Sequence, residues 1–352
     1  MADKILAKTE ILGLLQQSKA SNHWAATQLP GANFKTVQHI DAGTMNPNPD
    51  VQVDQFNTTD ANGTHFESER FYLDVTSGLP TIPFSGYADK STLAAFLVGA
   101  FQACSEAVGT PYLKTITAAG LTGTVNWANN SGYLFTLALD QGGSADDGAV
   151  MYNSLINNLT LSWDLNARGI ARLVTINGDW VGNDLDFEQT LDGSWTNGTP
   201  SQGNLFNNTD TWTMNTLTID SVDYSGECIR KVDLSVSNNI TSNCKTTGGK
   251  ANNYDWAPEY KMMVTLDYND TTEKLLNDFI GKKVISLSWT NDPEDNQEDG
   301  DMTISSSSGY MISPHKIYNG DFIGVQLEIR FYSTAAQTPL TVYLTDTIDW
   351  AF

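Results

Sequence analysis

Apolar and polar residues alternate with a period of two along much of the chain, and this pattern restricts the fold more than any other feature. Between residues 323 and 331, every odd position is apolar and every even position is polar or glycine. Residues 159–165 repeat the pattern. Because successive side chains of a strand point to opposite faces of its sheet, each segment predicts a strand with one buried face and one polar face.

Further alternating segments predict strands over most of the chain. A turn at residues 166–169 leads from the segment 159–165 into the run 171–176, which indicates a hairpin. Similar segments lie at 232–236, 262–268, 285–289 and 340–344, and the first half adds FKTVQHI, VQVDQF, HFESERFYLDV, GTVNWA and YLFTLAL. The sequence therefore predicts a mainly β protein.

Two interior segments have helical periodicity. In residues 91–108, apolar residues recur at spacings of three and four, Ser91 can act as the N-cap, and a glycine and a proline follow. In residues 271–281, an apolar stripe follows Asp270, which can cap a helix, and ends at a glycine. We therefore predict one helix in each half of the chain.

The segments that lead into these two helices resemble each other. Both read Tyr-x-Asp-x-Ser/Thr, the first starting at Tyr87 and the second, half a chain length later, at Tyr268. Residues 140–149 lie between them and have the Gly, Ser and Asp content of a linker. The pattern predicts two tandem β domains, each with one helix that covers a sheet. The alternative is that helix starts in general favour these residue types.

The predicted organisation has three parts. Residues 1–30 form an N-terminal arm, and residues 31–150 form a first β domain with the helix 91–108. Residues 151–352 form a second β domain with the helix 271–281. In each domain we expect β-sandwich packing with one flanking helix.

The charge balance excludes one class of function. The chain has 41 acidic and 19 basic residues, for a formal net charge of −22. Proteins that grip nucleic acid present Lys and Arg to the phosphates, so this chain is not expected to bind DNA. Like charge would suit a surface past which DNA moves without sticking.

Cysteine content and hydropathy bear on the compartment. The three cysteines, Cys104, Cys228 and Cys244, are an odd number and widely spaced, which argues against a disulfide framework. Residues 1–17 lack the uninterrupted apolar core of a signal peptide, and no segment has the length of a membrane span. We expect a protein made in a cytoplasm, with no membrane anchor.

Residues 291–301, NDPEDNQEDGD, carry six carboxylates and no basic residue. An EF-hand register that starts at Asp295 places Gly300 correctly, but position 12 is Ser306, so the bidentate ligand is missing. No helix-forming run leads into the segment. We expect a solvated turn between two strands, with no metal and no other cofactor.

No catalytic motif is present. The four histidines lack metal-ligand spacing, and phosphate-loop, serine-nucleophile and zinc-protease motifs are absent. Glu67 and Glu69 share one face of a predicted strand, as a glycosidase pair would, but polar strand faces carry such pairs routinely. The sequence indicates a structural protein rather than an enzyme.

Three features occur together: an unprocessed N-terminal arm, a strand that leads through GYADKSTLAAFLVGAFQ into a helix, and the long hairpin strands LTLSWD/ARLVTI and GVQLEIRFY. With them, the chain resembles the tail tube proteins of long-tailed bacteriophages, the siphophage type. The resemblance is architectural and covers most of the chain. It implies that strands of each domain join those of neighbouring subunits in one continuous β-barrel around a lumen.

The resemblance also implies a function. The protein would be a structural virion protein whose rings stack into the phage tail tube, an acidic conduit for DNA ejection. Its partners would be copies of itself, a tape measure protein, and the tail terminator and baseplate or tip proteins. Most such proteins are shorter and form hexameric rings. Duplicated halves would give a trimeric, pseudo-sixfold ring; otherwise, six chains would each carry an extra domain outside the tube.

The polar strand faces are the candidates for the lumen. On this resemblance we expect Thr160, Ser162, Asp164, Gln326 and Glu328 to line it, and the same residues would equally suit an outer wall that faces solvent.

A second function remains open on the sequence. A carbohydrate-binding or receptor-binding β-sandwich would use exposed tryptophans as sugar platforms. The candidates for such platforms are Trp163, Trp180, Trp195, Trp212 and Trp289.

Overall fold

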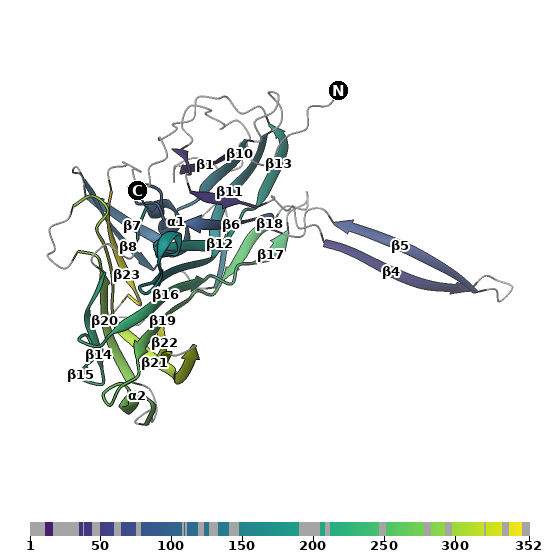
Figure 1. The fold of residues 1–352 in the computed structure, drawn as a ribbon. Helices are drawn as coiled ribbons and strands as arrows, with labels where there is room; N and C mark the ends of the chain where they lie inside the picture. Colours follow the sequence, from purple (N-terminus) through teal and green to yellow (C-terminus); the bar gives the residue numbers. More distant parts are fainter. Residues whose placement is uncertain are drawn as a thin grey trace.

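The chain is mainly β, as predicted, with a large antiparallel sheet and two short helices (Figure 1). The computed structural model describes residues 11–16, 35–37, 39–43, 50–59, 65–74, 79–107, 109, 111–118, 123–126, 133–140, 148–189, 205–207, 212–245, 251–277, 283–292, 298–319, 322–332 and 338–346. Across these residues, no sheet closes into a barrel.

Among the described residues up to 189, the elements are thirteen strands, one helix and one 3₁₀ turn. They are β1 (Ile11–Gln16), β2 (Lys35–Thr36), β3 (Ile40–Ala42), β4 (Asp50–Thr59), β5 (His65–Asp74), β6 (Thr81–Tyr87), α1 (Leu93–Phe101), β7 (Gln102–Ala107), β8 (Tyr112–Ala118), β9 (Gly123–Asn126), β10 (Phe135–Asp140), β11 (Gly148–Asp164), η3 (Gly169–Arg172), β12 (Thr175–Val181) and β13 (Asp184–Gln189).

The remaining elements contain the second helix. They are β14 (Thr213–Ile219), β15 (Val222–Asp223), β16 (Ile229–Ser237), β17 (Thr241–Lys245), β18 (Ala251–Trp256), β19 (Glu259–Asp267), α2 (Glu273–Asn277), β20 (Lys283–Thr290), β21 (Met302–Asn319), β22 (Phe322–Phe331) and β23 (Thr341–Asp346).

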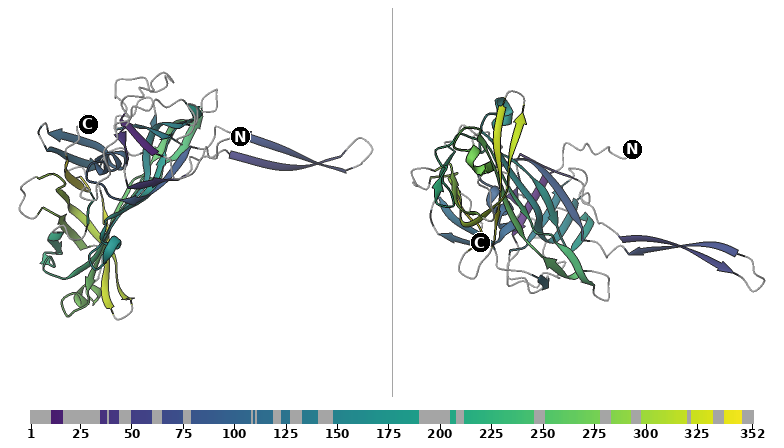
Figure 2. Two further views of the ribbon diagram at one scale, coloured as in Figure 1. Left: turned by 45° about the horizontal axis from the view of Figure 1, so that its top comes forward. Right: turned by 90° about the horizontal axis from the view of Figure 1, so that it is seen from below.

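Eight strands pair in the order β3-β6-β12-β11-β16-β19-β22-β21, each antiparallel to its neighbours. Figure 2 shows a broad sheet with its strands side by side. We call this the eight-stranded sheet. The hairpin β4–β5 projects away from the rest of the molecule, as both figures show. The turn predicted at residues 166–169 does join two paired strands, β11 and β12.

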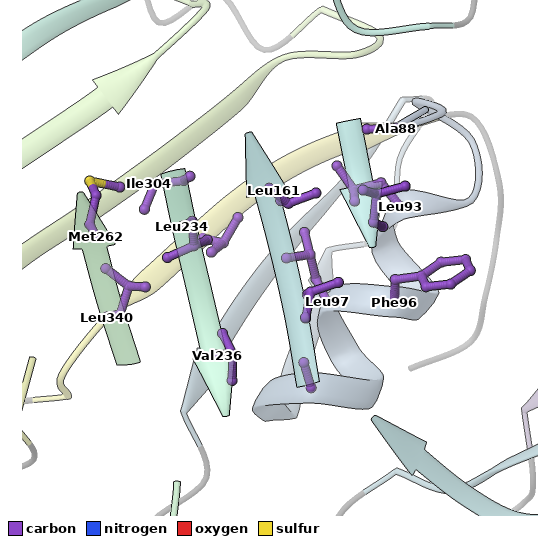
Figure 3. Packing of buried hydrophobic residues seen from close by; sticks show 14 of the residues in the cluster. Ala88, Leu93, Phe96, Leu97, Leu161, Leu234, Val236, Met262, Ile304 and Leu340 are labelled. Atoms are coloured by element: carbon purple, nitrogen blue, oxygen red, sulfur yellow. The ribbon is translucent and has the colours of Figure 1, made fainter. Parts of the chain in front are cut away.

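One face of the eight-stranded sheet carries the hydrophobic core. Leu161 pairs with Leu234, and Leu234 pairs with Met262, so the three side chains lie in a row across neighbouring strands. Figure 3 shows this row with the α1 residues Leu93 and Leu97 beside it. All nine residues of α1 are buried. The helix comes close to the sheet because Gly99 has no side chain: a Cβ there would lie 2.7 Å from the ring of Trp180.

Helix α1 is shorter than the predicted helix 91–108. Gln102 adopts a left-handed backbone conformation with φ of 67°, and its side-chain amide donates to the carbonyl oxygen of Gly99 at 2.7 Å. These features end the helix at Phe101. Residues 102–107 then form β7, which pairs with β8.

The two helices start with the same hydrogen bonds, although they lie in different halves of the chain. The Oδ1 atom of Asp89 accepts the N–H of Ser91 at 2.8 Å, and Oδ1 of Asn269 accepts the N–H of Thr271 at 2.8 Å. Asp89 and Asn269 therefore bond to the backbone just ahead of each helix. The N-cap of α1 is Thr92, whose side chain makes no capping hydrogen bond, so the prediction of Ser91 as the N-cap was wrong. Helix α2 covers residues 273–277 of the predicted range 271–281, and residues 278–281 lie outside the described residues.

Two groups of strands pair in the same order. The first group is β1–β3, β6 and β10–β13, and the second is β14–β16 and β19–β23. Seven pairings correspond: β1–β2 with β14–β15, β1–β10 with β14–β20, β3–β6 with β16–β19, β6–β12 with β19–β22, β10–β11 with β20–β21, β11–β12 with β21–β22, and β11–β13 with β21–β23. The hairpins β4–β5 and β17–β18 also hold matching places in the order.

The predicted linker and domain boundary fall within the first group. Residues 140–149 connect β10 to β11, which pair with each other, so this segment is the connection of a hairpin. The boundary predicted between residues 150 and 151 lies inside β11. Residues 11–16 of the predicted N-terminal arm form β1, which pairs with β10, and the rest of the arm lies outside the described residues.

Candidate assembly surface

All five residues predicted to line a lumen lie on one face of the eight-stranded sheet, opposite the core. Ser162 pairs with Asp233, Asp233 with Met263, and Met263 with Glu328. Directly paired residues in antiparallel strands share a face, so these four side chains form a row. One neighbouring row contains Asp164 and Gln326. Another contains Thr160, which pairs with Ser235, and Ser235 pairs in turn with Lys261. We call this surface the polar face.

Side chains on the polar face bond to one another across strands. The hydroxyl of Ser162 donates to the carboxylate of Asp233, and the Asn158 amide donates to the Asp179 carboxylate at 2.7 Å. The Ser237 hydroxyl donates to Oδ1 of Asn158 at 2.9 Å. The polar face is thus ordered by its own hydrogen bonds.

On β16, β19 and β22, the side chains of Lys231, Lys261 and Arg330 each lie beside a carboxylate two residues away on the same strand. The nitrogen–oxygen distances are 2.9 Å for Lys231 with Asp233, 3.0 Å for Lys261 with Glu259, and 3.0 Å for Arg330 with Glu328. The hydrogen bond from Lys261 lowers the pKa of Glu259, and the hydrogen bond to Glu328 raises the pKa of Arg330. Such solvated pairs add little stability, but they neutralise cations that would otherwise attract phosphate.

The polar face has a net negative charge. Arg230, at the end of β16, pairs with Asp267 and lowers the pKa of that carboxyl through a hydrogen bond. The described carboxylates of the face outnumber its Lys and Arg side chains by seven to four: Asp41, Asp164, Asp179, Asp233, Glu259, Asp267 and Glu328 against Arg230, Lys231, Lys261 and Arg330. Opposite charges two residues apart in alternating segments were the sequence signal for these pairs.

The eight-stranded sheet ends in two edges. Along β21, residues 303–311 pair with β20, but no described strand pairs with residues 312–319 on that side. At the other end, β3 pairs with β6, and its outer side has no partner strand within the described part of the chain. Exposed strand edges present N–H and C=O groups to which another strand can bond.

The acidic segment 291–301 packs against other elements at its described end. The Gly300 N–H donates to the Thr345 carbonyl at 2.8 Å, and the Asn291 amide donates to the Gly300 carbonyl at 3.0 Å. Gly300 has φ of +88°, and a Cβ there would lie 2.4 Å from the side chain of Lys90. Burial raises the pKa of Asp301 to about 6. Residues 293–297, with the calcium register start at Asp295, lie outside the described residues.

The tryptophans considered as sugar platforms are mostly buried. Trp163, Trp212 and Trp289 form one cluster, in which the rings of Trp212 and Trp289 stack with centroids 5.5 Å apart. Trp180 is fully buried, and Trp195 lies outside the described residues. Glu67 and Glu69, the glycosidase candidates, lie on β5 of the projecting hairpin.

The described residues contain neither a metal cluster nor a membrane-spanning helix. Among the described residues, no group of three or more His, Cys, Asp or Glu side chains is placed to hold a metal ion. No helix in this part of the chain has both the length and the apolar character needed to cross a membrane. Compared with known proteins, the chain fits no family model, and no curated protein sequence matches it.

Proposed function

We propose that the protein is a phage tail tube protein, a structural virion protein whose copies extend one another's sheets into rings that stack as a conduit for DNA. One observation carries the proposal: within the described residues, a sheet of two matching halves has an unpaired stretch at each outer edge and one polar, net negative face. The architectural resemblance described above supplies the biological setting.

The matching halves supply the rule of assembly. The strands β3-β6-β12-β11 are followed in the sheet by β16-β19-β22-β21, which pair in the same order. We infer that the two groups are tandem copies of one domain. When one edge of a unit binds the opposite edge of the next identical unit, the same contact can repeat from unit to unit. The repeated contact forms a ring if the successive rotations add up to a full turn. Three chains would give six such units, a trimeric and pseudo-sixfold ring.

The polar face would form the inner wall. The opposite face carries the hydrophobic core and α1. If that face pointed inward, the core and the helix would fill the central space of the ring. With the polar face inward, neighbouring subunits form one β-barrel, and Thr160, Ser162, Asp164, Gln326 and Glu328 face the bore. Because the Lys and Arg side chains are paired with carboxylates, they would not bind DNA phosphates. The surplus carboxylates would repel phosphates that come within the Debye length of about 8 Å.

This proposal places the protein in the virion tail, assembled in the cytoplasm of the host. Its other copies would be the main partners, within a ring and between stacked rings. A tape measure protein would occupy the bore during assembly, and terminator and tip proteins would close the two ends. No enzymatic activity is part of the role.

The first test is assembly of the purified protein. We expect mass photometry to show oligomers that grow with protein concentration, and negative-stain microscopy to show rings or rods with a central bore. Monodisperse monomers over the whole concentration range would overturn the proposal.

The second test concerns the bore. Asp164→Lys with Glu328→Lys should give tubes that retain double-stranded DNA, whereas wild-type tubes release it. The matched control is Asp220→Lys with Asp270→Lys, two exposed carboxylates outside the eight-stranded sheet. If both double variants retain DNA equally, the polar face does not line the bore.

A further inference from the structure

We propose that residues 312–319 of β21 pair with β3 of the next copy in the register that joins β11 to β16 within one chain. This inference rests on the proposed function and adds the interface. The internal junction connects the first group to the second, through pairs that run from Asn158–Ser237 to Asp164–Lys231. In this junction, β11 corresponds to β21 and β16 corresponds to β3. The outer edges of β21 and β3 therefore match the two strand edges that the junction joins.

Matching β-bulges align β11 with β21. The pairing of β11 with β12 skips Asn157, between Ile156 and Asn158. The pairing of β21 with β22 skips Ile312, between Met311 and Ser313. Asn157 therefore corresponds to Ile312, and the junction residues 158–164 that follow it correspond to residues 313–319.

The partners of β3 and β16 align these two strands. Asp41 pairs with Ser85 of β6, and Lys231 pairs with Thr265 of β19. Ser85 precedes the helix start at Asp89 by the same distance in sequence as Thr265 precedes the helix start at Asn269. Asp41 therefore corresponds to Lys231, and the next residue of β3 corresponds to the next residue of β16.

Together, the two alignments fix the register between copies. Inside the chain, Asp164 pairs with Lys231, and Trp163 pairs with Val232. Between copies, Asn319 would lie opposite Asp41, and Tyr318 would lie opposite Ala42. Strand order then runs from β21 of one subunit into β3 of the next, without a break in the sheet.

Backbone geometry at the two edges agrees with this register. The Gly43 N–H donates to Pro83 and the Tyr87 N–H donates to His39, so positions 39, 41 and 43 direct their backbone groups toward β6. Because this orientation alternates along a strand, Ala42 directs its N–H and C=O toward the open edge. Its counterpart Val232 directs the same groups toward β11, since the Leu165 N–H bonds to Arg230 at 3.0 Å.

Side-chain burial provides a separate observation. Trp163 is 1% exposed because Trp212 and Trp289 of the second group pack against it. Its counterpart Tyr318 is 70% exposed, and no described strand pairs with this part of β21 on the outer side. A next copy placed by the same alignment would bring its own strand group over Tyr318.

Disulfide trapping tests the register. In a background with Cys104, Cys228 and Cys244 replaced by serine, we would combine Asp41→Cys with Asn319→Cys. Both positions lie at a non-hydrogen-bonded pair, where Cα atoms are about 4.5 Å apart, within the range of a disulfide. We expect covalent multimers on a non-reducing gel.

Two matched pairs serve as controls. Asp164→Cys with Lys231→Cys occupies the corresponding positions inside the chain and should give a disulfide within one chain, with no multimers. Asp41→Cys with Ile317→Cys shifts the register by two residues on the same face, and should give several-fold less multimer.

The outcomes separate the register from the function. Rings in microscopy with equal or stronger crosslinking of the shifted pair would overturn the register and leave the tail tube proposal standing. If rings form but neither the Asp41/Asn319 pair nor the Asp41/Ile317 pair crosslinks, the interface lies at other edges. Absence of any ring or rod, with the internal control pair formed, would overturn both.

Discussion

The strand–helix units β6–α1 and β19–α2 have matching hydrogen bonds just ahead of the helix, yet many more side chains are buried in α1 than in α2. All nine residues of α1 are buried, whereas Leu275 is the buried residue among the five of α2. Local sequence sets how a helix starts, because Asp89 and Asn269 each need only a nearby N–H. How far the helix continues depends on what packs over it.

The first unit is covered because the second group follows it in the chain. Asn238, at the end of β16, donates to the carbonyl of Ala100 at 2.9 Å and to that of Ile156 at 2.6 Å. It therefore ties the end of α1 and strand β11 to the second group. Among the described residues, no such neighbour covers the second unit, and the proposed ring would supply one.

The largest expected difference between the two units is at Trp163 and Tyr318. Trp163→Ala should cost about 3–5 kcal/mol of unfolding free energy, because a fully packed indole is lost. Tyr318→Ala should change it by less than about 0.5 kcal/mol in the monomer, as exposed residues usually do. Denaturant titration at low protein concentration measures both.

Assembly should show the opposite ranking for Tyr318. Light scattering at high concentration is expected to reveal weaker association of Tyr318→Ala, with the monomer as stable as wild type. Unchanged association would mean that no neighbour covers Tyr318.

The helices themselves offer the next contrast. Phe96 and Leu276 occupy equivalent positions, and Phe96 packs edge-on against Phe84 with ring centroids 4.9 Å apart. Phe96→Ala should cost about 3–5 kcal/mol. Leu276 is partly buried, so Leu276→Ala should cost about 1 kcal/mol in the monomer. Calorimetry of both variants checks the ranking, and equal losses would contradict the different cover of the two helices.

Alternation in the sequence predicted several strands and the face that each of their residues occupies, but it missed β7, which lies inside the predicted helix 91–108, and β21. The segment 323–331 became β22, and its even residues lie on the polar face as expected. This success has a simple cause: the side-chain direction of a strand depends on parity alone.

Features that depend on distant contacts were not predictable in this way. The junction of β11 with β16 joins strands that are far apart in the sequence, and no local pattern specifies it. The helix end at Phe101 and the role of residues 140–149 were missed for a related reason. A short apolar run can belong to a helix or to a strand, so its spacing did not show where α1 ends. Linkers and hairpin loops have similar compositions, so composition did not distinguish the two for residues 140–149.

A smaller effect should test whether the two helix starts are equivalent. Asp89→Ala and Asn269→Ala each remove the Oδ1 acceptor of the first turn, and each should cost about 1 kcal/mol. Exchange of the natural residues, as Asp89→Asn and Asn269→Asp, should cost less, since both side chains keep the acceptor. Thermal melts of the four variants decide; a full loss in the exchanged variants would show that the two turns differ in chemistry.

The smallest effect concerns the acidic segment, the counterpart in the second group of the β10–β11 connection. Burial raises the pKa of Asp301 from 3.8 to about 6, against the opposing influence of Lys90 and the Glu298 N–H. A carboxyl with a raised folded-state pKa favours the folded state when protonated, and this contribution is lost as pH rises toward and through 6. Asp301→Asn should therefore melt at a higher temperature than wild type at pH 8, and the difference should shrink toward pH 4. The matched control is Asp299→Asn, at an exposed neighbouring position. A constant difference for Asp301→Asn across this range would assign the effect to packing against Lys90 and Thr345 rather than to charge.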